Sequence, residues 1–158
     1  MSIVLVEKNA TFDHIIDNLY LGCINSVDEK YLRTNYINTV INISNTRYEK
    51  LEGIAYYDFD IEDDSSEDIS QFFEQFYSIV SQTDSNVLVH CMNSVSRSVT
   101  LTLSYLLRTM NLRSAYDYLK SKRTQYTKPN TGFTKQLISL ESSLYGDTTM
   151  KTIDFFKK

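Results

Sequence analysis

Cysteine, proline and glycine are all scarce in this chain of 158 residues, which contains two Cys, one Pro, four Gly and no Trp. The two cysteines, Cys23 and Cys91, are too few for a disulfide framework or for a zinc finger. So few thiols are typical of a protein that works in a reducing compartment such as the cytosol or the nucleus. We therefore expect both thiols to stay reduced.

Long hydrophobic runs and an excess of positive charge are missing as well. No apolar stretch approaches the roughly 20 residues of a membrane-spanning helix, and the start, "MSIVLVEKNA", lacks the pattern of a signal peptide. The formal net charge of −4 argues against a broad surface for nucleic acid or membrane, which requires clustered Lys and Arg. We expect no nucleic-acid or membrane partner, a cytoplasmic or nuclear location, and a local site for any anionic ligand.

The length and the hydrophobic content of 42% predict one domain over residues 1–158, with its core at about 12–145 and a C-terminal tail at 146–158. Short β-rich runs alternate with helical spacing of apolar residues. Strands are predicted at 15–22, 37–44, 54–61 and 86–90, and helices at 69–80, 97–110, 113–126 and 131–145. This alternation predicts an α/β fold in which a mostly parallel central sheet of about four to five strands is flanked by helices on both faces. For the tail we expect a frayed terminus, although Phe155 and Phe156 could dock on the core or on a partner.

The stretch "VHCMNSVSRSVT", residues 89–100, lies where a buried strand ends and a helix begins. The backbone N–H groups of the connecting loop and of the first helical turn converge there, and the helix dipole adds roughly half a positive charge. Such a place binds a tetrahedral dianion, and it stabilises the thiolate of Cys91, which is the nucleophilic form. Arg97 adds a planar fork for two phosphate oxygens. The pattern indicates phosphate chemistry at an activated cysteine.

His90-Cys91, five further residues and then Arg97-Ser98 resemble the signature of the cysteine-dependent protein tyrosine phosphatases, and the rest of the chain resembles their small dual-specificity branch. The matching segments, in order over roughly residues 12–145, are "LYLG", "INTVINIS", "ISQFFEQF", "VTLTLSYLL" and "RTQYTKPNTGFTKQLISLE". The resemblance implies a protein tyrosine phosphatase-like fold. It also implies a protein phosphatase that hydrolyses phosphotyrosine and phosphoserine or phosphothreonine in phosphorylated proteins through a phosphocysteine intermediate, without cofactor or metal.

The resemblance implies a role for each residue of the site as well. Cys91 attacks phosphorus, Arg97 holds the phosphoryl oxygens, and an Asp protonates the departing oxygen and later activates water. Ser98 hydrogen-bonds to the cysteine sulfur, while His90 and Asn130 support the loop. The phosphate-binding loop itself comprises Met92, Asn93, Ser94, Val95 and Ser96.

The general acid must come from the acidic segment "DFDIEDDSSED", residues 58–68, which contains Asp58, Asp60, Asp63, Asp64 and Asp68. Counting back from "ISQFF" places Asp63 at the acid position of the family. Asp64 would take that place if the loop length differed by one residue. For the other carboxylates a solvated acidic loop is the simpler interpretation.

The loop departs from the family at Asn93 and Ser94, where a small or acidic residue and then a Gly are common. If residue 94 must adopt a positive φ, Ser costs ~1 kcal/mol relative to Gly. This departure supports an alternative, a catalytically weak pseudophosphatase that captures phosphorylated partners. Retention of Cys91, Arg97 and Ser98 favours the enzyme. A phospholipid or an RNA 5′ end as substrate is disfavoured, because the loop lacks Lys and because Ser, not Thr, follows Arg97.

Overall fold

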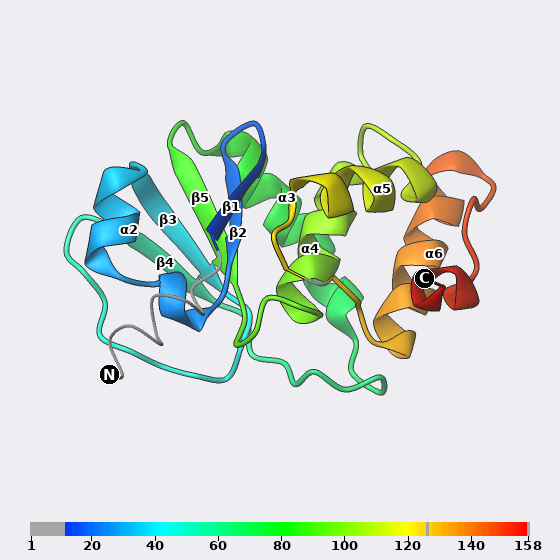
Figure 1. The fold of residues 1–158 in the computed structure, drawn as a ribbon, viewed down its shortest axis with the longest axis horizontal. Helices are drawn as coiled ribbons and strands as arrows, with labels where there is room; N and C mark the ends of the chain where they lie inside the picture. The colour runs from blue at the N-terminus through cyan, green and yellow to red at the C-terminus, as the bar shows by residue number, and fades with distance from the viewer. Residues whose placement is uncertain (1–11, 126, 158) are drawn as a thin grey trace.

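The computed structural model describes residues 12–125 and 127–157, and its five strands form one sheet in the order β1-β2-β5-β3-β4 (Figure 1). The segment "MSIVLVEKNA", which lacks the pattern of a signal peptide, lies outside the described residues. The strands are β1 (Phe12–Ile16), β2 (Leu19–Gly22), β3 (Ile37–Asn42), β4 (Ala55–Asp58) and β5 (Asn86–His90). Only the β1–β2 pair is antiparallel among these strands. The mostly parallel sheet predicted from the sequence is confirmed.

Helices cover both faces of the sheet because its central strands are apolar on both faces. On one face, Leu32 of α2 (Glu29–Thr34) packs with Val40 and Leu88 in a small buried cluster. Val87 and Val89 alternate with Leu88 along β5, so they point to the opposite face and join the main core. Figure 1 shows α2 on one side of the sheet and α4, α5 and α6 on the other. The two apolar clusters therefore hold the central strand from both faces.

The helix α4 (Arg97–Leu106) is the central helix, and it follows the short loop after β5. It is buried along nearly its whole length although its sequence, "RSVTLTLSYL", contains many hydroxyl groups. Three of these hydroxyls donate to carbonyls of the same helix or its cap: Thr100 Oγ1 to Ser96 O at 2.7 Å, Thr102 Oγ1 to Ser98 O at 2.9 Å and Ser104 Oγ to Leu101 O at 2.6 Å. Because these buried hydroxyls have local partners, their burial leaves no polar group unsatisfied, and the helix holds its first residue, Arg97, at a fixed place.

The remaining predicted helices are present; the helix at 131–145 has the predicted bounds, and the other two have shifted ends. They are η2 (Ile69–Phe72), a 3-10 turn that leads into α3 (Phe73–Gln82), then α5 (Leu112–Lys122) and α6 (Thr131–Tyr145). A short 3-10 turn, η1 (Ile24–Ser26), follows β2. Asparagine caps explain two of the starts: Asn111 Oδ1 accepts from Ser114 N, and Asn130 Oδ1 accepts from Phe133 N. No helix within the described ranges is long and apolar enough to cross a membrane.

The C-terminal tail docks on the core instead of fraying. A 3-10 helix, η3 (Thr152–Phe156), buries Phe155, whose ring lies 4.7 Å from that of Tyr116 on α5. The buried carboxylate of Glu141 on α6 accepts hydrogen bonds from Leu112 N and from Thr149 N, so it ties the start of the tail to two helices. The frayed terminus expected from the sequence is therefore wrong, because apolar burial and a satisfied buried carboxylate offset the loss of chain entropy.

Candidate active site

The loop from Cys91 to Ser96 runs between β5 and α4, and its carbonyl groups are bound by the segments around it. Met92 O accepts from Ile24 N at 3.2 Å, and Val95 O accepts from Lys128 N at 3.0 Å. Among the described residues, none accepts a hydrogen bond from the backbone N–H groups of Met92 to Ser96. The loop therefore has its acceptors satisfied and its N–H donors available to an anion, as the sequence pattern indicates.

Ser94 lies at the centre of this loop in a left-handed conformation, with φ of 60°. It is fully buried, and its hydroxyl has no hydrogen-bond partner in the described part of the chain. Arg123 fixes the turn from outside by donating from Nη2 to Ser94 O at 2.8 Å. The loop thus adopts the positive φ that a Gly would take without strain, at a cost of ~1 kcal/mol for Ser.

Cys91 and Ser98 lie together beneath the loop. The Sγ atom of Cys91 is 3.1 Å from Oγ of Ser98, which lies in the first turn of α4, and both side chains are buried. A hydroxyl at this distance can donate to a thiolate, and the N-terminus of α4 favours negative charge at the same place. The structure therefore places a hydroxyl donor and the start of a helix at the Cys91 sulfur.

Arg97 is also buried, with an exposed fraction of 9%, and its side chain reaches the acidic segment. Its Nη1 atom donates to Ile61 O at 2.9 Å. This bond occupies one of the five N–H groups of the guanidinium and fixes the plane of the fork. Arg97 therefore links the start of α4 to the chain just before Asp63.

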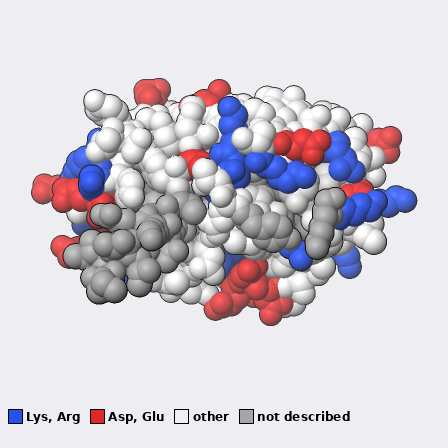
Figure 2. Space-filling model, in the orientation of Figure 1, with Lys and Arg blue, Asp and Glu red and all other residues white. Residues whose placement is uncertain are grey.

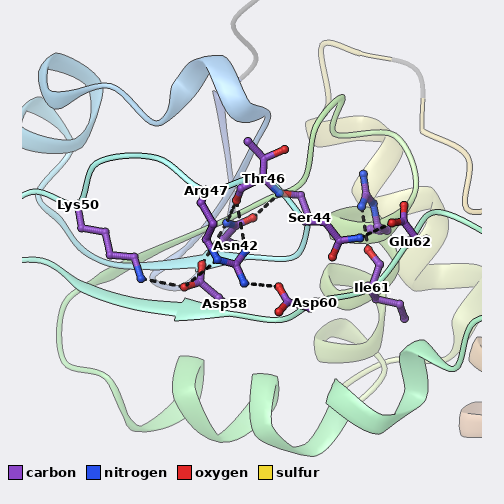
Figure 3. A network of polar contacts seen from close by, with 11 residues as sticks. Asn42, Ser44, Thr46, Arg47, Lys50, Asp58, Asp60, Ile61 and Glu62 are labelled. Carbon is purple, nitrogen blue, oxygen red and sulfur yellow. Dashed lines mark hydrogen bonds and ion pairs between the residues drawn. The ribbon is translucent and has the colours of Figure 1, made fainter.

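Two of the five candidate acids are held by cations at the end of β4. Asp58 Oδ2 lies 2.8 Å from Lys50 Nζ, and Asp60 Oδ1 lies 2.5 Å from Arg47 Nη2 (Figure 3). Partial burial raises the pKa of Asp58, but the bonds and charges of Lys50 and Arg47 outweigh it and leave this pKa below its usual value. Asp58 therefore stays ionised and does not donate a proton, and Asp60 is occupied by its ion pair with Arg47.

Two more of the acids serve local turns. Asp64 Oδ1 accepts from Ser66 N at 2.8 Å and from Ser66 Oγ at 2.9 Å, and the backbone bond is the main reason that the pKa of Asp64 is lowered. Asp68 caps η2 by accepting from Ser70 N at 3.1 Å. Neither carboxylate contacts the phosphate-binding loop through these bonds.

Asp63 is connected to the loop through Asn130. The Nδ2 atom of Asn130 donates to Asp63 Oδ1 at 2.9 Å, and the backbone N–H of Asn130 donates to Ser96 Oγ at 3.0 Å. The acidic segment also packs directly on α6, because a Cβ atom at Gly132 would lie 1.9 Å from Ser65 O. The structure therefore distinguishes Asp63 from its neighbour Asp64, which the sequence left as an alternative.

His90 supports the loop from below as a neutral imidazole. Burial lowers its pKa to about 4, and Nδ1 lies 3.2 Å from Cys91 O while Nε2 lies 2.7 Å from the hydroxyl of Tyr48. A carbonyl can only accept, so Nδ1 carries the proton and the Tyr48 hydroxyl donates to Nε2. Burial raises the pKa of Tyr48, which keeps that hydroxyl protonated.

Sequence reasoning missed the supporting residues Tyr48, Arg123 and Gln125. Gln125 Nε2 donates to Asn93 O at 2.5 Å, and Arg123, with a side chain only 1% exposed, bonds to Ser94 O and lies 3.6 Å from Asp13. Burial lowers the pKa of Arg123, and the nearby carboxylate of Asp13 opposes that shift. No local pattern in the sequence marks these residues. Arg123, for example, ends the stretch "KSKR", which has the appearance of an ordinary charged helix end.

Comparisons with known proteins agree with this geometry. Residues 19–143 match the family model for "Dual specificity phosphatase, catalytic domain". The chain is 36% identical over 140 residues to human dual specificity protein phosphatase 7, covering 82% of this chain and 33% of that protein. It is 34% identical over 137 residues to mouse dual specificity protein phosphatase 2, covering 82% of this chain and 43% of that one. The chain thus spans less than half the length of these curated relatives.

A solved structure of similar shape is that of human DUSP28, with a TM-score of 0.77, 25% identity, and coverage of 84% of this chain and 94% of that one. The human tyrosine phosphatase-like serine/threonine/tyrosine-interacting protein matches with a TM-score of 0.76, 27% identity, and coverage of 84% and 96%. This chain belongs to the dual specificity phosphatase catalytic-domain family, the small dual-specificity branch of the cysteine-dependent protein tyrosine phosphatases. The resemblance noted in the sequence is confirmed.

Proposed function

We propose that this chain is a cysteine-dependent protein phosphatase that hydrolyses phosphotyrosine and phosphoserine or phosphothreonine in phosphorylated proteins. The observation that carries the proposal is the placement of Cys91 Sγ at the N-terminus of α4, 3.1 Å from Ser98 Oγ and beneath a loop with available N–H groups. Family membership and the identity to named dual specificity phosphatases support the same activity.

In the first step, the thiolate of Cys91 attacks phosphorus while the bond from phosphorus to the substrate oxygen breaks. The N–H groups of Met92 to Ser96 and the guanidinium of Arg97 bind the three phosphoryl oxygens, where charge is held in the transition state. Asp63 gives its proton to the departing oxygen, so that the leaving group departs as a neutral hydroxyl. The product of this step is a phosphocysteine.

In the second step, water attacks the phosphocysteine, and Asp63, now a carboxylate, takes a proton from that water. The bond between sulfur and phosphorus breaks, and the electron pair returns to Cys91 as a thiolate. The hydroxyl of Ser98 donates to that sulfur and makes it a better leaving group. Phosphate leaves with Cys91 and Asp63 back in their starting forms.

The remaining site residues have positioning roles in this proposal. His90 and Asn130 hold the loop and the acid by the bonds described above, and Tyr48 holds His90. The chemistry needs neither a cofactor nor a metal. It does need a reduced thiol, which suits a cytoplasmic or nuclear location and a part in signalling by dephosphorylation. We propose phosphorylated proteins as partners, and not a nucleic acid or a membrane, because the net charge of the chain is −4.

Hydrolysis of p-nitrophenyl phosphate at about pH 6 tests the proposal, with Cys91→Ser and vanadate inhibition as controls. We expect turnover by the wild type that is lost in the variant, blocked by vanadate and unaffected by EDTA. A wild-type chain that binds vanadate but shows no turnover would instead support the pseudophosphatase. Loss of activity with EDTA would contradict a metal-free mechanism.

A further inference from the structure

A concave surface lies directly beside the phosphate-binding loop. We call it the tail cleft: a space of about 530 Å³ between α5, the segment that joins α5 to α6, and the docked C-terminal tail. The residues of its lining that matter here are Tyr116, Lys120, Gln125, Lys128, Phe156 and Lys157. The mechanism above uses none of their side chains on the reacting phosphate.

The tail cleft is joined to the phosphate-binding loop by two hydrogen bonds. Gln125 Nε2 donates to Asn93 O at 2.5 Å, and Lys128 N donates to Val95 O at 3.0 Å. The same segment continues to Asn130, which bonds to Asp63. The tail cleft is therefore near enough for the residues next to a phosphorylated side chain to reach it while the phosphate lies on the loop.

Three elements each contribute one lysine to the tail cleft, and aromatic rings lie beneath two of them. Lys120 Nζ is 4.5 Å from the ring centre of Tyr116, and Lys128 Nζ is 4.4 Å from that of Phe156. Such cation–π contacts hold ammonium groups near an apolar floor without neutralising them. Figure 2 shows Lys and Arg side chains gathered over α5 on this face of the molecule.

Carboxylates neutralise this charge only in part. Asp154 lies 3.0 Å from Lys157, and Asp117 lies 3.8 Å from Lys120. Within residues 12–125 and 127–157, Lys128 has no carboxylate partner in an ion pair. The tail cleft is thus a positively charged surface on a chain whose net charge is −4, and it is complementary to an acidic ligand.

We propose that the tail cleft binds an acidic segment of the substrate, that is, Asp or Glu residues close in sequence to the phosphorylated residue. The inference rests on the proposed function and adds a preference for acidic flanking sequence. The ammonium groups pair with the carboxylates, while the partly exposed ring of Phe156 contacts the aliphatic part of the Asp or Glu side chains. Burial of Phe155 fixes the wall that carries Phe156 and Lys157, so the docked tail is part of the recognition surface.

The test compares two phosphotyrosine peptides of equal length, one with Glu and Asp flanking the phosphotyrosine and one with Gln and Asn at the same positions. We expect kcat/KM for the acidic peptide to exceed that for the neutral peptide by about fivefold at low salt, because two or three exposed ion pairs each add a small amount to binding. This ratio of kcat/KM should fall toward one in the double variant Lys128→Gln/Lys157→Gln. It should also fall toward one for the wild type at about 0.5 M NaCl, because salt screens the charges. Lys30→Gln, on α2 at the opposite face, is the matched control and keeps the wild-type ratio.

Binding of both peptides to Cys91→Ser gives a second measurement that does not depend on turnover. If the wild type does not hydrolyse p-nitrophenyl phosphate, the proposed function is overturned. Tighter binding of the acidic peptide than of the neutral peptide to Cys91→Ser would still support the tail cleft in that case. Equal kcat/KM and equal affinity for the two peptides would overturn the tail cleft and leave the phosphatase standing. An acidic peptide without phosphate that bound as tightly as the phosphopeptide would also overturn it, because the cleft would then be a separate docking site.

Discussion

The side-chain amide of Asn130 donates a hydrogen bond of 2.9 Å to the carboxylate of Asp63, although 67 residues separate them in the chain. The backbone N–H of Asn130 bonds to Ser96 as well, so one residue connects the acid segment to the phosphate-binding loop. Asn130 can do both because it is the N-cap of α6, which fixes its backbone and leaves Nδ2 pointing outward while Oδ1 accepts from Phe133 N. The distance between acid and loop therefore depends on how α6 packs.

Asp63→Asn should lower kcat for a phosphotyrosine peptide by about 10²-fold or more, because the departing oxygen then leaves without a proton. Asp64→Asn, whose amide oxygen can still accept the bonds from Ser66, should stay within about twofold of wild type. Steady-state kinetics from pH 5 to 8 would decide, and the reverse ranking of the two variants would assign the acid to Asp64.

Gly132→Ala should displace the acidic segment, because the new methyl group would overlap Ser65 O. We expect kcat to fall by about tenfold or more while the Kd for vanadate changes little, since the loop that binds the anion is untouched. Activity assays and vanadate titration measure the two effects separately. Equal loss of activity and of vanadate affinity would show that the whole loop has moved. Gly53→Ala has no neighbour to overlap, but its φ of 84° also strains the backbone, so it controls for a general loss of stability.

Ser94→Gly should stabilise the protein by about 1 kcal/mol, because Gly relieves the positive φ and removes a buried hydroxyl that lacks a partner in the described structure. The higher entropy of Gly in the unfolded chain offsets part of this gain. Ser94→Ala removes the hydroxyl but keeps the strain, so it separates the two contributions. Urea denaturation measures both variants, and a Ser94→Gly protein less stable than Ser94→Ala would refute the strain argument.

Stability should fall as the pH drops from about 6.5 to about 4, because His90 is buried as a neutral group. Its folded pKa lies below the unfolded value of 6.5, so in this range the unfolded chain binds a proton that the folded chain does not. The contribution is complete above pH 6.5, and its loss reaches on the order of 3 kcal/mol near pH 4. Urea denaturation at several pH values measures the slope.

His90→Gln should flatten that slope, whereas His14→Gln should keep it, because His14 is exposed. These are the only two histidines in the sequence, so the pair is a complete comparison. An unchanged slope in His90→Gln would mean that other groups set the acid sensitivity.

Ser98→Ala should slow the second chemical step more than the first, because its hydroxyl lies 3.1 Å from the sulfur that must leave. We expect a burst of p-nitrophenol followed by a slow steady rate, with phosphocysteine accumulating on Cys91. Rapid-quench kinetics and mass measurement of the trapped protein would detect it. Slower formation of the first product without a burst would place Ser98 in the first step instead.

The sequence by itself determined the features that depend on neighbours along the chain. Alternating β-rich and helical runs predicted the parallel α/β sheet, and the spacing of Cys91, Arg97 and Ser98 predicted an anion loop between strand and helix, because that geometry is set by a few consecutive residues. The sequence also raised the condition that a positive φ at residue 94 would cost Ser more than Gly, and the structure has a φ of 60° there.

Only the tertiary structure decided what depends on contacts between distant segments. Asp63 and Asp64 are adjacent and chemically alike, but the packing of α6 brings Asn130 to the first of them, whereas the second bonds to Ser66. Tyr48 reaches His90 across 42 residues, and Arg123 reaches Ser94 across 29. The tail was expected to fray, but the structure buries Phe155 against residues that are distant in the sequence. Local spacing fixes backbone geometry, but the packing of helices on the sheet decides which side chains meet.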